Sequence, residues 1–435
     1  MDKYAEIRVP IAHNNASIRR KENKCVLCGK CKDICKKQVG VAGYWKYDSE
    51  DIVCINCGQC ANFCPVQAIV EQDETNSLLS AIKNPQKKVA VLVAPAVRVS
   101  MGESFDFSAG KFVAGKLVAA LKSLRADYVF DVAFGADLTV MEEATELLNR
   151  KKQGQNLPLF TSCCPAWVKY VKSFYPDLLP NLSTCKSPIA MQSSVVKNIF
   201  AKQAGINPAD LVVVAIVPCV AKKAEAKLLC LAGEYGRDTD IVLSVRELTN
   251  LIKSKNIDFA NLLEAEFDKP FSVGTGAGVM FGTSTGVMQA TLRTAYYLKT
   301  NQTPPSDLIN LKPLRGYAGA KTATVQLGDT AVNVCTIYGT ANARKVLDKL
   351  AKFDFDFVEI MACPNGCVGG GGQPRQENNS TATHHRAVGL FNYDSKSTLK
   401  CSYQNAEVQA VYKKYFGKPN SKKAQAMLHV NHMAR

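Results

Sequence analysis

The sequence predicts an α/β protein: a large domain built on parallel β-sheet, preceded by a small α+β domain that is dense in cysteine. Two observations lead to this prediction. From Lys88 onward, short apolar runs rich in β-branched residues alternate with helical patterns, which is typical of parallel sheets with helices between the strands. Before that point, residues 24–75 hold eight of the 17 cysteines of the chain.

Four runs in the large domain are short and apolar enough to form buried strands, namely residues 89–95, 127–135, 158–162 and 211–218. Between them lie two stretches in which apolar residues recur with helical spacing, residues 115–124 and 137–153. The C-terminal end is expected to form two helices, residues 405–417 and 421–430, separated by Lys418-Pro419-Asn420.

These changes in composition and hydrophobic periodicity divide the chain into four expected parts. Residues 1–23 are polar and lack periodicity, so they form an N-terminal arm or an edge strand. Residues 24–80 form the cysteine-rich domain, residues 88–400 the large domain, and residues 401–435 a C-terminal helical segment. The intervening residues 76–88 are amphipathic and end in turn and charge signals, as a linker would.

The cysteine content limits the class of protein. An odd, clustered set of thiols in a 435-residue chain does not fit a disulfide framework, which is typical of short secreted proteins, and favours iron–sulfur or zinc sites. Only five histidines are present, which argues against haem. No apolar run reaches the ~20 residues that cross a membrane, and the N-terminus lacks a secretory signal. We therefore expect a soluble cytoplasmic protein.

The cysteine-rich domain contains an internal duplication. Cys25-x2-Cys28-x2-Cys31-x3-Cys35 recurs 29 positions later as Cys54-x2-Cys57-x2-Cys60-x3-Cys64. Three thiolates at this spacing can hold three corners of a cubane, and in two-cluster ferredoxins the fourth cysteine of each run binds the other cluster. One 4Fe–4S cluster is therefore assigned to Cys25, Cys28, Cys31 and Cys64, and a second to Cys54, Cys57, Cys60 and Cys35.

Zinc knuckles are the alternative for this repeat, but zinc sites commonly use two C-x2-C pairs and leave a regular triplet unexplained. Two cubanes predict a module for electron relay. The formal charge of +16 would suit nucleic acid or an acidic protein. Because no recognition helix and no interleaving of basic and aromatic residues is evident, we expect no nucleic-acid partner, and instead an acidic electron carrier, ferredoxin or flavodoxin.

Three segments of the large domain place cysteine beside proline or glycine: TSCCPAW at 161–167, PCVAKKAE at 218–225 and MACPNGCVGGGGQP at 361–374. The first two follow predicted strands, where open α/β sheets place their chemistry. We expect glycines 369–372 to let the backbone approach a bulky inorganic group. Lys222 lies one helical turn from Cys219, where its cation would face anionic ligands. The alternative, buried structural cysteines, is preferred for Cys185, Cys230, Cys335 and Cys401.

In this order, TSCCPAW, PCxxKxxE and MACPxGCxxGGGQP resemble the three signatures of the FeFe (iron-only) hydrogenases, and the similarity extends from the cysteine repeat to the C-terminal helix. The resemblance implies a large catalytic domain of two parallel-sheet lobes. It also implies reversible reduction of protons to dihydrogen, dedicated maturation proteins, and a hydrogen-producing organelle as an alternative to the cytoplasm. The cofactor implied is an H-cluster: a 4Fe–4S cubane joined to a two-iron unit with CO, CN and dithiolate ligands.

Site residues follow from the resemblance by matching motifs. The cubane would be bound by Cys164, Cys219, Cys363 and Cys367, with Cys367 bridging to the two-iron unit. Cys163 would donate protons beside the open iron, and Lys222 would hydrogen-bond a cyanide. The cofactor pocket would be lined by Met361 and by the turn Ala94-Pro95-Ala96.

A proton relay is implied as well. Residues 141–146 and 182–188 resemble the family's relay segments, so Glu143, Ser183 and Glu146 would extend the path from Cys163, with Arg150 near its exit. Positions 143, 146 and 150 share one helix face. An ordinary helix with salt bridges is the alternative interpretation.

The chain departs from the family pattern at Lys36, Val217, Ile189-Ala190, Gln289 and Asn365. Changes beside the two-iron unit are expected to alter potential, catalytic bias or oxygen sensitivity, and not to prevent cluster binding. Asn365 stands where glycine is usual, and asparagine tolerates the positive φ that such a turn requires.

Two further functions compete with a catalytic hydrogenase. A hydrogen sensor would append a signalling domain and relax the proton path, and an iron–sulfur assembly factor would lack the Cys163–Lys222 pair. The segment 274–279, GTGAGV, suggests a dinucleotide site, but it lacks the third glycine of GxGxxG and an evident ribose-binding acid. Nicotinamide binding is therefore not expected.

Overall fold

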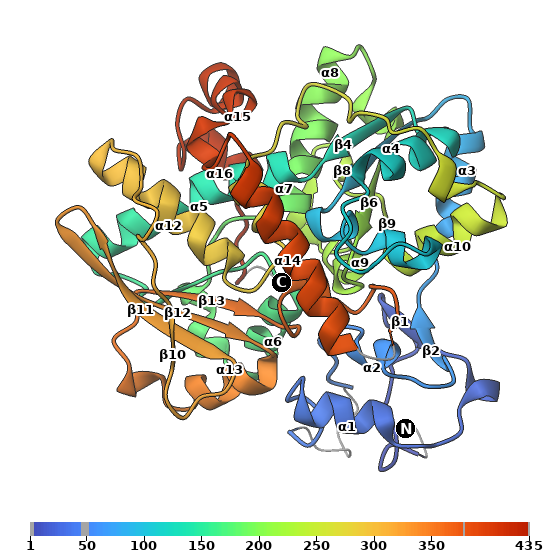
Figure 1. Cartoon of the computed structure of the whole chain (residues 1–435), viewed down its shortest axis with the longest axis horizontal. Helices are drawn as coiled ribbons and strands as arrows, with labels where there is room; N and C mark the ends of the chain where they lie inside the picture. The colour runs from blue at the N-terminus through green and yellow to red at the C-terminus, as the bar shows by residue number, and fades with distance from the viewer. Residues whose placement is uncertain (1–3, 45–51, 377–378, 434–435) are drawn as a thin grey trace.

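The computed structural model describes residues 4–44, 52–376 and 379–433. Residues 1–3 of the expected N-terminal arm and residues 434–435 of the C-terminal segment lie outside the described residues. In Figure 1 a small N-terminal domain lies below two lobes, and α14 (Asn379–Lys396) runs across the front between them. The expected α/β architecture with two sheet-centred lobes is confirmed.

The small domain pairs the end of the expected arm with the far end of the cysteine repeat. Strand β1 (Ile18–Arg20) lies antiparallel to β2 (Ile69–Glu71). Helices α1 (Lys30–Lys37) and α2 (Gln59–Asn62) each begin after a glycine with positive φ, at equivalent places in the two halves of the duplication. This α+β arrangement brings the two cysteine runs together.

The first lobe is built on a four-stranded parallel sheet of order β4-β3-β6-β9, shown at the right of Figure 1. Its strands are β3 (Lys88–Val93), β4 (Tyr128–Asp131), β6 (Leu211–Val217) and β9 (Ile241–Ser244). The apolar runs are buried along nearly their whole length because helices cover the sheet. These helices are α3 (Thr75–Lys83), α4 (Ala114–Ser123), α7 (Pro188–Val195), α9 (Ala221–Glu225) and α10 (Val245–Ser254).

The second lobe contains a mixed five-stranded sheet of order β10-β11-β12-β13-β5. Strands β5 (Leu159–Phe160), β12 (Thr330–Tyr338) and β13 (Phe357–Met361) are parallel, whereas β10 (Lys312–Pro313) and β11 (Ala320–Leu327) add an antiparallel half that the prediction of parallel sheet did not include. Helices α6 (Pro165–Phe174), α12 (Gly286–Thr300) and α13 (Thr340–Leu347) belong to this lobe.

Helix α5 (Ala133–Gln153) joins the lobes, because it packs on α7 of the first lobe and on α12 of the second. It begins four residues earlier than the predicted helix 137–153, and strand β4 ends correspondingly earlier than the run 127–135. The reason is Asp131, whose carboxylate accepts a hydrogen bond from the backbone amide of Ala133 at 2.7 Å and so stabilises the helix start. Helix α11 (Gly276–Met280) packs against α5 and α14.

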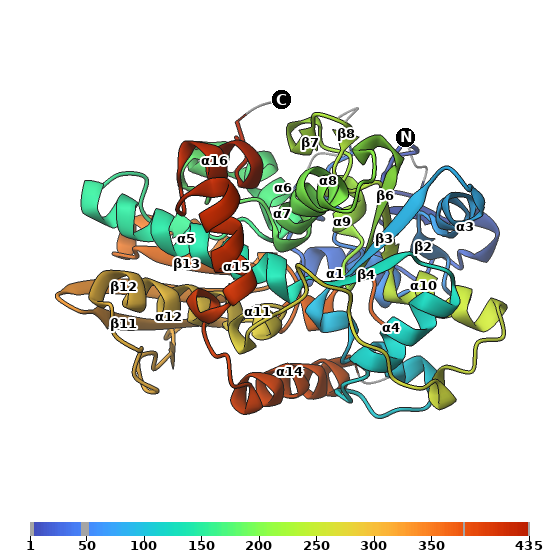
Figure 2. The same ribbon diagram turned by 90° about the horizontal axis from the view of Figure 1, so that it is seen from above.

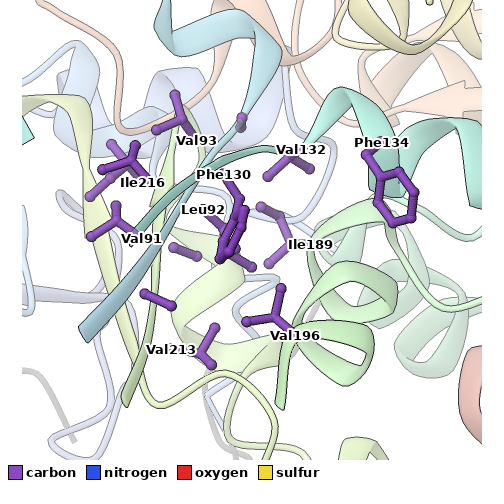
Figure 3. Close-up of a cluster of buried hydrophobic side chains, with 14 of the residues drawn as sticks. Val91, Leu92, Val93, Phe130, Val132, Phe134, Ile189, Val196, Val213 and Ile216 are labelled. Carbon is purple, nitrogen blue, oxygen red and sulfur yellow. The ribbon is translucent and has the colours of Figure 1, made fainter. Parts of the chain in front are cut away.

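A large hydrophobic core supports the first lobe. Figure 3 shows its centre, where Val91, Leu92, Phe130 and Ile216 from three adjacent strands pack with Val196. All five are almost fully inaccessible to solvent. The expected linker 76–88 is part of this structure, since α3 packs on β3 and its Leu78 belongs to the same core.

The C-terminal segment forms helices α15 (Ala406–Val411) and α16 (Lys422–Leu428), with a π-helical turn over Tyr412–Phe416. It packs over α5 and α7, as Figure 2 shows from above. Within the part of the chain that the structure describes, no helix combines the length and apolar character needed to cross a bilayer.

Candidate active site

A small cavity of about 70 Å³ lies where the carboxyl ends of strands from both sheets face one another. Strands β3 and β6 of the first lobe lead into the turns at Ala94-Pro95 and at Pro218-Cys219, and β5 and β13 of the second lobe lead into the other two cysteine motifs. The lining is almost entirely apolar apart from sulfur and one lysine. It includes Ala94, Pro95, Cys163, Cys164, Cys219, Lys222, Met361 and Cys367.

The four thiols matched to a cubane lie together. Cys164, Cys219 and Cys367 line the cavity, and Cys363 is buried close enough to the other three for their charges to raise the pKa of its thiol, after the larger effect of burial. Burial likewise raises the pKa of the Cys219 thiol to about 12. Such buried thiols become thiolates when a metal centre binds them, because the metal supplies the compensating positive charge.

The distances between the thiol sulfurs distinguish a site for a cluster from a site for a single metal ion. In a tetrahedral zinc site with Zn–S bonds of about 2.3 Å, the sulfurs lie roughly 3.8 Å apart. Among the described residues, which include every cysteine, no three cysteine sulfurs lie within 4.8 Å of one another. The thiols are therefore too widely spaced for a single zinc ion and are compatible with a larger centre such as a cubane.

Lys222 is the cation at this site. It lies on α9, lines the cavity, and donates hydrogen bonds to the Glu225 carboxylate at 2.8 Å and to the Cys163 carbonyl at 3.2 Å. Glu225 in turn accepts from the Ser187 hydroxyl at 3.1 Å. The ammonium group is thus held at the wall of a largely apolar cavity, where it favours an anionic ligand.

The glycine run 369–372 allows close contacts between backbones. A Cβ on Gly371 would lie 2.0 Å from the Cys57 carbonyl oxygen, and a Cβ on Gly370 would lie 2.3 Å from the Pro218 carbonyl oxygen. A side chain at either position would therefore prevent this packing. This contact joins the second ferredoxin loop to the large domain next to Cys219.

A second apolar cavity of about 30 Å³ lies in the small domain. Its lining contains Cys35 from the first run together with Cys54, Cys57 and Cys60 from the second. The structure thus brings together the four residues assigned to one cluster, including the cysteine that crosses over from the other run. Of the first set, Cys31 and Cys64 lie near each other, Cys25 is half-buried and Cys28 is exposed.

Three of the residues predicted to relay protons form a buried, hydrogen-bonded chain. The hydroxyl of Ser183 donates to Glu146 at 2.8 Å, and Arg150 donates to the other oxygen of the same carboxylate at 2.6 Å. Ser183 also lies close enough to Glu143 to lower the pKa of that carboxyl. Arg150 is not free at an exit, because it also donates to the carbonyls of Asn156, Pro180 and Leu182.

Glu143 sits between this chain and Cys163. Burial, and then the charge of Glu146, raise the pKa of the Glu143 carboxyl to about 8. Burial and then the Glu143 charge raise the pKa of the Cys163 thiol well above its usual value. Both groups therefore hold a proton near neutral pH. The geometry suits a proton relay better than a set of ordinary salt bridges, since only Glu146 and Arg150 form an ion pair.

Two of the departures from the family pattern line the cavity. Val217 is buried and, together with Ile189, adds apolar surface to the lining. Ile189 is also in the core of the first lobe (Figure 3). Asn365 has φ 57°, so the expected positive φ at this position is confirmed. Gln289 lies on α12 and donates to the Thr285 hydroxyl at 3.2 Å.

The glycines of the segment 274–279 are explained by helix packing. A Cβ on Gly274 would lie 2.2 Å from the Cβ of Ala133, and one on Gly278 would lie 2.5 Å from the Ala133 carbonyl oxygen. Helix α5 therefore occupies the space that a dinucleotide would need.

Sequence reasoning missed two polar residues of the site. Thr291 donates its hydroxyl to Glu143 at 3.3 Å, and Gln59 donates its amide to the Cys363 sulfur at 3.1 Å. Thr291 lies within an ordinary helical pattern and Gln59 within a cysteine loop whose spacing alone drew attention. No local signal distinguished either residue.

Known proteins resemble this chain over most of its length. Residues 87–371 match the family described as "Iron only hydrogenase large subunit, C-terminal domain", and residues 380–435 match "Iron hydrogenase small subunit". "NADP-reducing hydrogenase subunit HndD" of Solidesulfovibrio fructosivorans is 38% identical over 97% of this chain and 75% of that protein. "Iron hydrogenase 1" of Clostridium pasteurianum is 37% identical over 96% of this chain and 76% of that protein.

The solved structures agree. The FeFe-hydrogenase HydA1 of Chlamydomonas reinhardtii superimposes with a TM-score of 0.74 at 38% identity, covering 82% of this chain and 98% of that chain. More distant relatives include "Protein NAR1" of Arabidopsis thaliana, 30% identical over 84% of this chain and 81% of that protein. With its family matches, its fold and its clustered cysteines, the chain belongs to the iron-only (FeFe) hydrogenases, oxidoreductases that act on H2.

Proposed function

We propose that the protein catalyses the reversible reduction of protons to dihydrogen at an H-cluster held by Cys164, Cys219, Cys363 and Cys367. The observation that supports this most strongly is the apolar cavity between the two sheets, which has thiols and Lys222 at its wall, with the Glu143 carboxyl near the Cys163 thiol. When bound, the two-iron unit would supply an open iron at which protons and electrons combine.

The chain's own residues would deliver the protons. The Cys163 thiol would donate a proton into the cavity and recover one from Glu143. Ser183 would pass protons between the two carboxyls, since its hydroxyl both donates and accepts, and Arg150 holds Glu146 in position. Lys222 would hold an anionic ligand of the two-iron unit, and Met361 and the Ala94-Pro95 turn would shape the cavity.

Electrons would arrive through two 4Fe–4S clusters in the small domain. The second set of cysteines supports this route, because the backbone of Cys57 and Gly58 packs against Gly371, and Gly58 also contacts Val220 beside Cys219. The inner cluster would therefore lie next to the loops that hold the H-cluster, with no intervening element.

The outer half of the duplication suits an acidic carrier, ferredoxin or flavodoxin. Residues 19–38 contain eight lysines and arginines against two acidic residues, whereas residues 52–67 contain no charged residue at all. Cys28, Lys24, Lys30, Lys36 and Lys37 are exposed, as is Val26. A partly apolar spot beside a cluster, surrounded by cations, would attract and orient an acidic protein.

Two other proposals complete this assignment. Maturation proteins would build the two-iron unit, because no residue of the chain can supply its CO and CN ligands. The protein would act in the cytoplasm, with a hydrogen-producing organelle as the alternative.

Two other functions remain in competition. An iron–sulfur assembly factor is suggested by the likeness to "Cytosolic Fe-S cluster assembly factor narfl" of Danio rerio, 28% identical over 80% of this chain, and a hydrogen sensor would share the cluster. The test is co-expression with the maturation proteins, followed by infrared spectroscopy and viologen-linked H2 production. We expect CO and CN bands together with turnover. Bands without turnover would favour the sensor, and no bands would favour the assembly factor.

Replacing the proposed proton donor gives a second test. Cys163→Ala is expected to abolish most H2 production while the CO and CN bands persist. Cys230→Ala is the matched control, because Cys230 is half-buried and lies outside the active-site cavity. Full activity in the Cys163 variant would refute the assigned role.

A further inference from the structure

One side chain of the small domain directly contacts a thiol of the active site. Gln59 lies on α2 between Cys57 and Cys60, and its side chain is completely inaccessible to solvent. Its amide nitrogen lies 3.1 Å from the Cys363 sulfur and 2.8 Å from the Gly369 carbonyl oxygen. A residue from the inner ferredoxin loop therefore donates a hydrogen bond to a sulfur in the large domain.

The orientation of this amide follows from its neighbours. Gln38 donates its own side-chain amide to the Gln59 oxygen at 3.1 Å. Rotating the Gln59 amide by 180° would place its oxygen against a sulfur and a carbonyl oxygen, both of them acceptors, and its nitrogen against a donor. Only the orientation with nitrogen toward Cys363 satisfies all three neighbours.

We propose that Gln59 is a positioning residue that raises the reduction potential of the cluster bound by Cys363. A hydrogen bond donated to a ligating sulfur stabilises the reduced cluster more than the oxidised one, because the reduced cluster places more negative charge on its sulfurs. The effect is large in a buried site, where water does not screen it. The proposal rests on the proposed function, since it requires Cys363 to be a cluster ligand.

The competing explanation is that Gln59 only fastens the small domain to the large one. Asn62 offers a matched control for this explanation. It lies on the same helix and donates to the neighbouring Gly370 carbonyl at 3.0 Å, and its side-chain oxygen also accepts from Arg246. Replacing Asn62 therefore removes contacts between the same helix and loop but leaves the bond to sulfur intact.

The experiment compares Gln59→Met and Asn62→Ala with the wild type, each matured to the holoenzyme. The fraction of reduced cluster is followed by electron paramagnetic resonance, and the CO and CN bands by infrared spectroscopy, during a redox titration. At the wild-type midpoint, we expect the ratio of reduced to oxidised cluster to fall about threefold in Gln59→Met, the change expected for loss of one hydrogen bond. We expect no change in Asn62→Ala.

A second variant covers the case in which Gln59→Met does not retain its cluster. Gln38→Met leaves Gln59 in place but removes the donor that orients its amide, so the ratio should fall by a smaller factor. An unchanged ratio in cluster-loaded Gln59→Met, or equal changes in Gln59→Met and Asn62→Ala, would overturn the proposal. Absence of CO and CN bands in the matured wild type would overturn the proposed function, and this proposal with it.

Discussion

Thr291 gives the sharpest test of the proton path, because it touches Glu143 without belonging to the relay. Its hydroxyl donates to Glu143 at 3.3 Å and so stabilises the ionised carboxylate. This hydrogen bond lowers the pKa of Glu143, which burial nevertheless raises to about 8. Thr291→Val removes this donor while keeping the shape of the side chain. The pKa of Glu143 should therefore rise.

The size of the rise follows from the geometry. A hydrogen bond to a charged group contributes about 1.5–3 kcal/mol when its geometry is good. The 3.3 Å bond is longer than the ~2.9 Å optimum. Since about 1.4 kcal/mol corresponds to one pKa unit, we expect a rise of roughly half a unit to one unit.

The assay is the pH dependence of viologen-linked H2 production. If protonated Glu143 supplies Cys163, a pKa of about 8 implies that the wild-type rate falls roughly tenfold between pH 7 and pH 9, as the protonated fraction falls. In Thr291→Val this alkaline limb should move to higher pH. An unmoved limb, or one that moves to lower pH, would refute the assignment of the titrating group to Glu143.

The matched control lies one turn further along the same helix. Thr294 is buried, and its hydroxyl finds no hydrogen-bond partner among the residues that the structure describes. Thr294→Val makes the same chemical change without touching Glu143, so its pH profile should coincide with that of the wild type. An equal shift in both variants would mean that packing, and not the hydrogen bond, determines the pH at which the alkaline limb lies.

Three further predictions concern the contact between the domains, the accessory clusters and the surface proposed to bind the electron carrier. Gly371→Ala should lower the free energy of unfolding by about 1–3 kcal/mol, because the new Cβ would meet the Cys57 carbonyl at 2.0 Å; thermal unfolding checks this, and no loss of stability would contradict the close contact. Cys35→Ser should cost the inner cluster and leave the outer one, so iron content and electron paramagnetic resonance should report one accessory cluster fewer; loss of the outer cluster instead would reverse the assignment of the fourth ligands. The double change Lys30→Glu and Lys36→Glu should raise the KM for an acidic carrier severalfold at low salt and leave viologen-linked activity unchanged. Lys413→Glu with Lys414→Glu, an equal charge change on the C-terminal segment, should change neither the KM nor the viologen-linked activity. Equal effects of the two double variants on the KM would refute a docking role for α1.

Much of the architecture could be predicted because its signals are local. Buried parallel strands require apolar β-branched runs, so β3 and β6 were evident from 89–95 and 211–218. The spacing of the cysteine repeat predicted that Cys35 joins the second run, and the structure places Cys35, Cys54, Cys57 and Cys60 around one cavity. The positive φ of Asn365 followed from the residue type alone.

What could not be predicted depends on contacts between distant segments. The hairpin of β11 and β12 was missed because polar residues interrupt both strands, which leaves no continuous apolar run. The glycines at 369–372 were expected to lie near a metal group; that a Cβ on Gly371 would meet the Cys57 carbonyl, more than 300 positions away in sequence, could not be predicted from a local pattern. Gln59 is assigned a role only because α2 meets the Cys363 loop in three dimensions.

The two halves of the cysteine duplication differ in character: the outer half is charged and exposed, and the inner half packs against the large domain. Only the outer half of the proposed electron relay could therefore be exchanged by itself. The outer half carries exposed, charged side chains, so the proposed partner preference could be altered by surface substitutions in residues 19–38 without repacking a core. The inner half packs against Gly371, Val220 and Cys363, so a replacement of this half would also require changes in the loops of the large domain that it contacts. A new electron source would therefore be accommodated by substitutions on helix α1, with helix α2 kept unchanged.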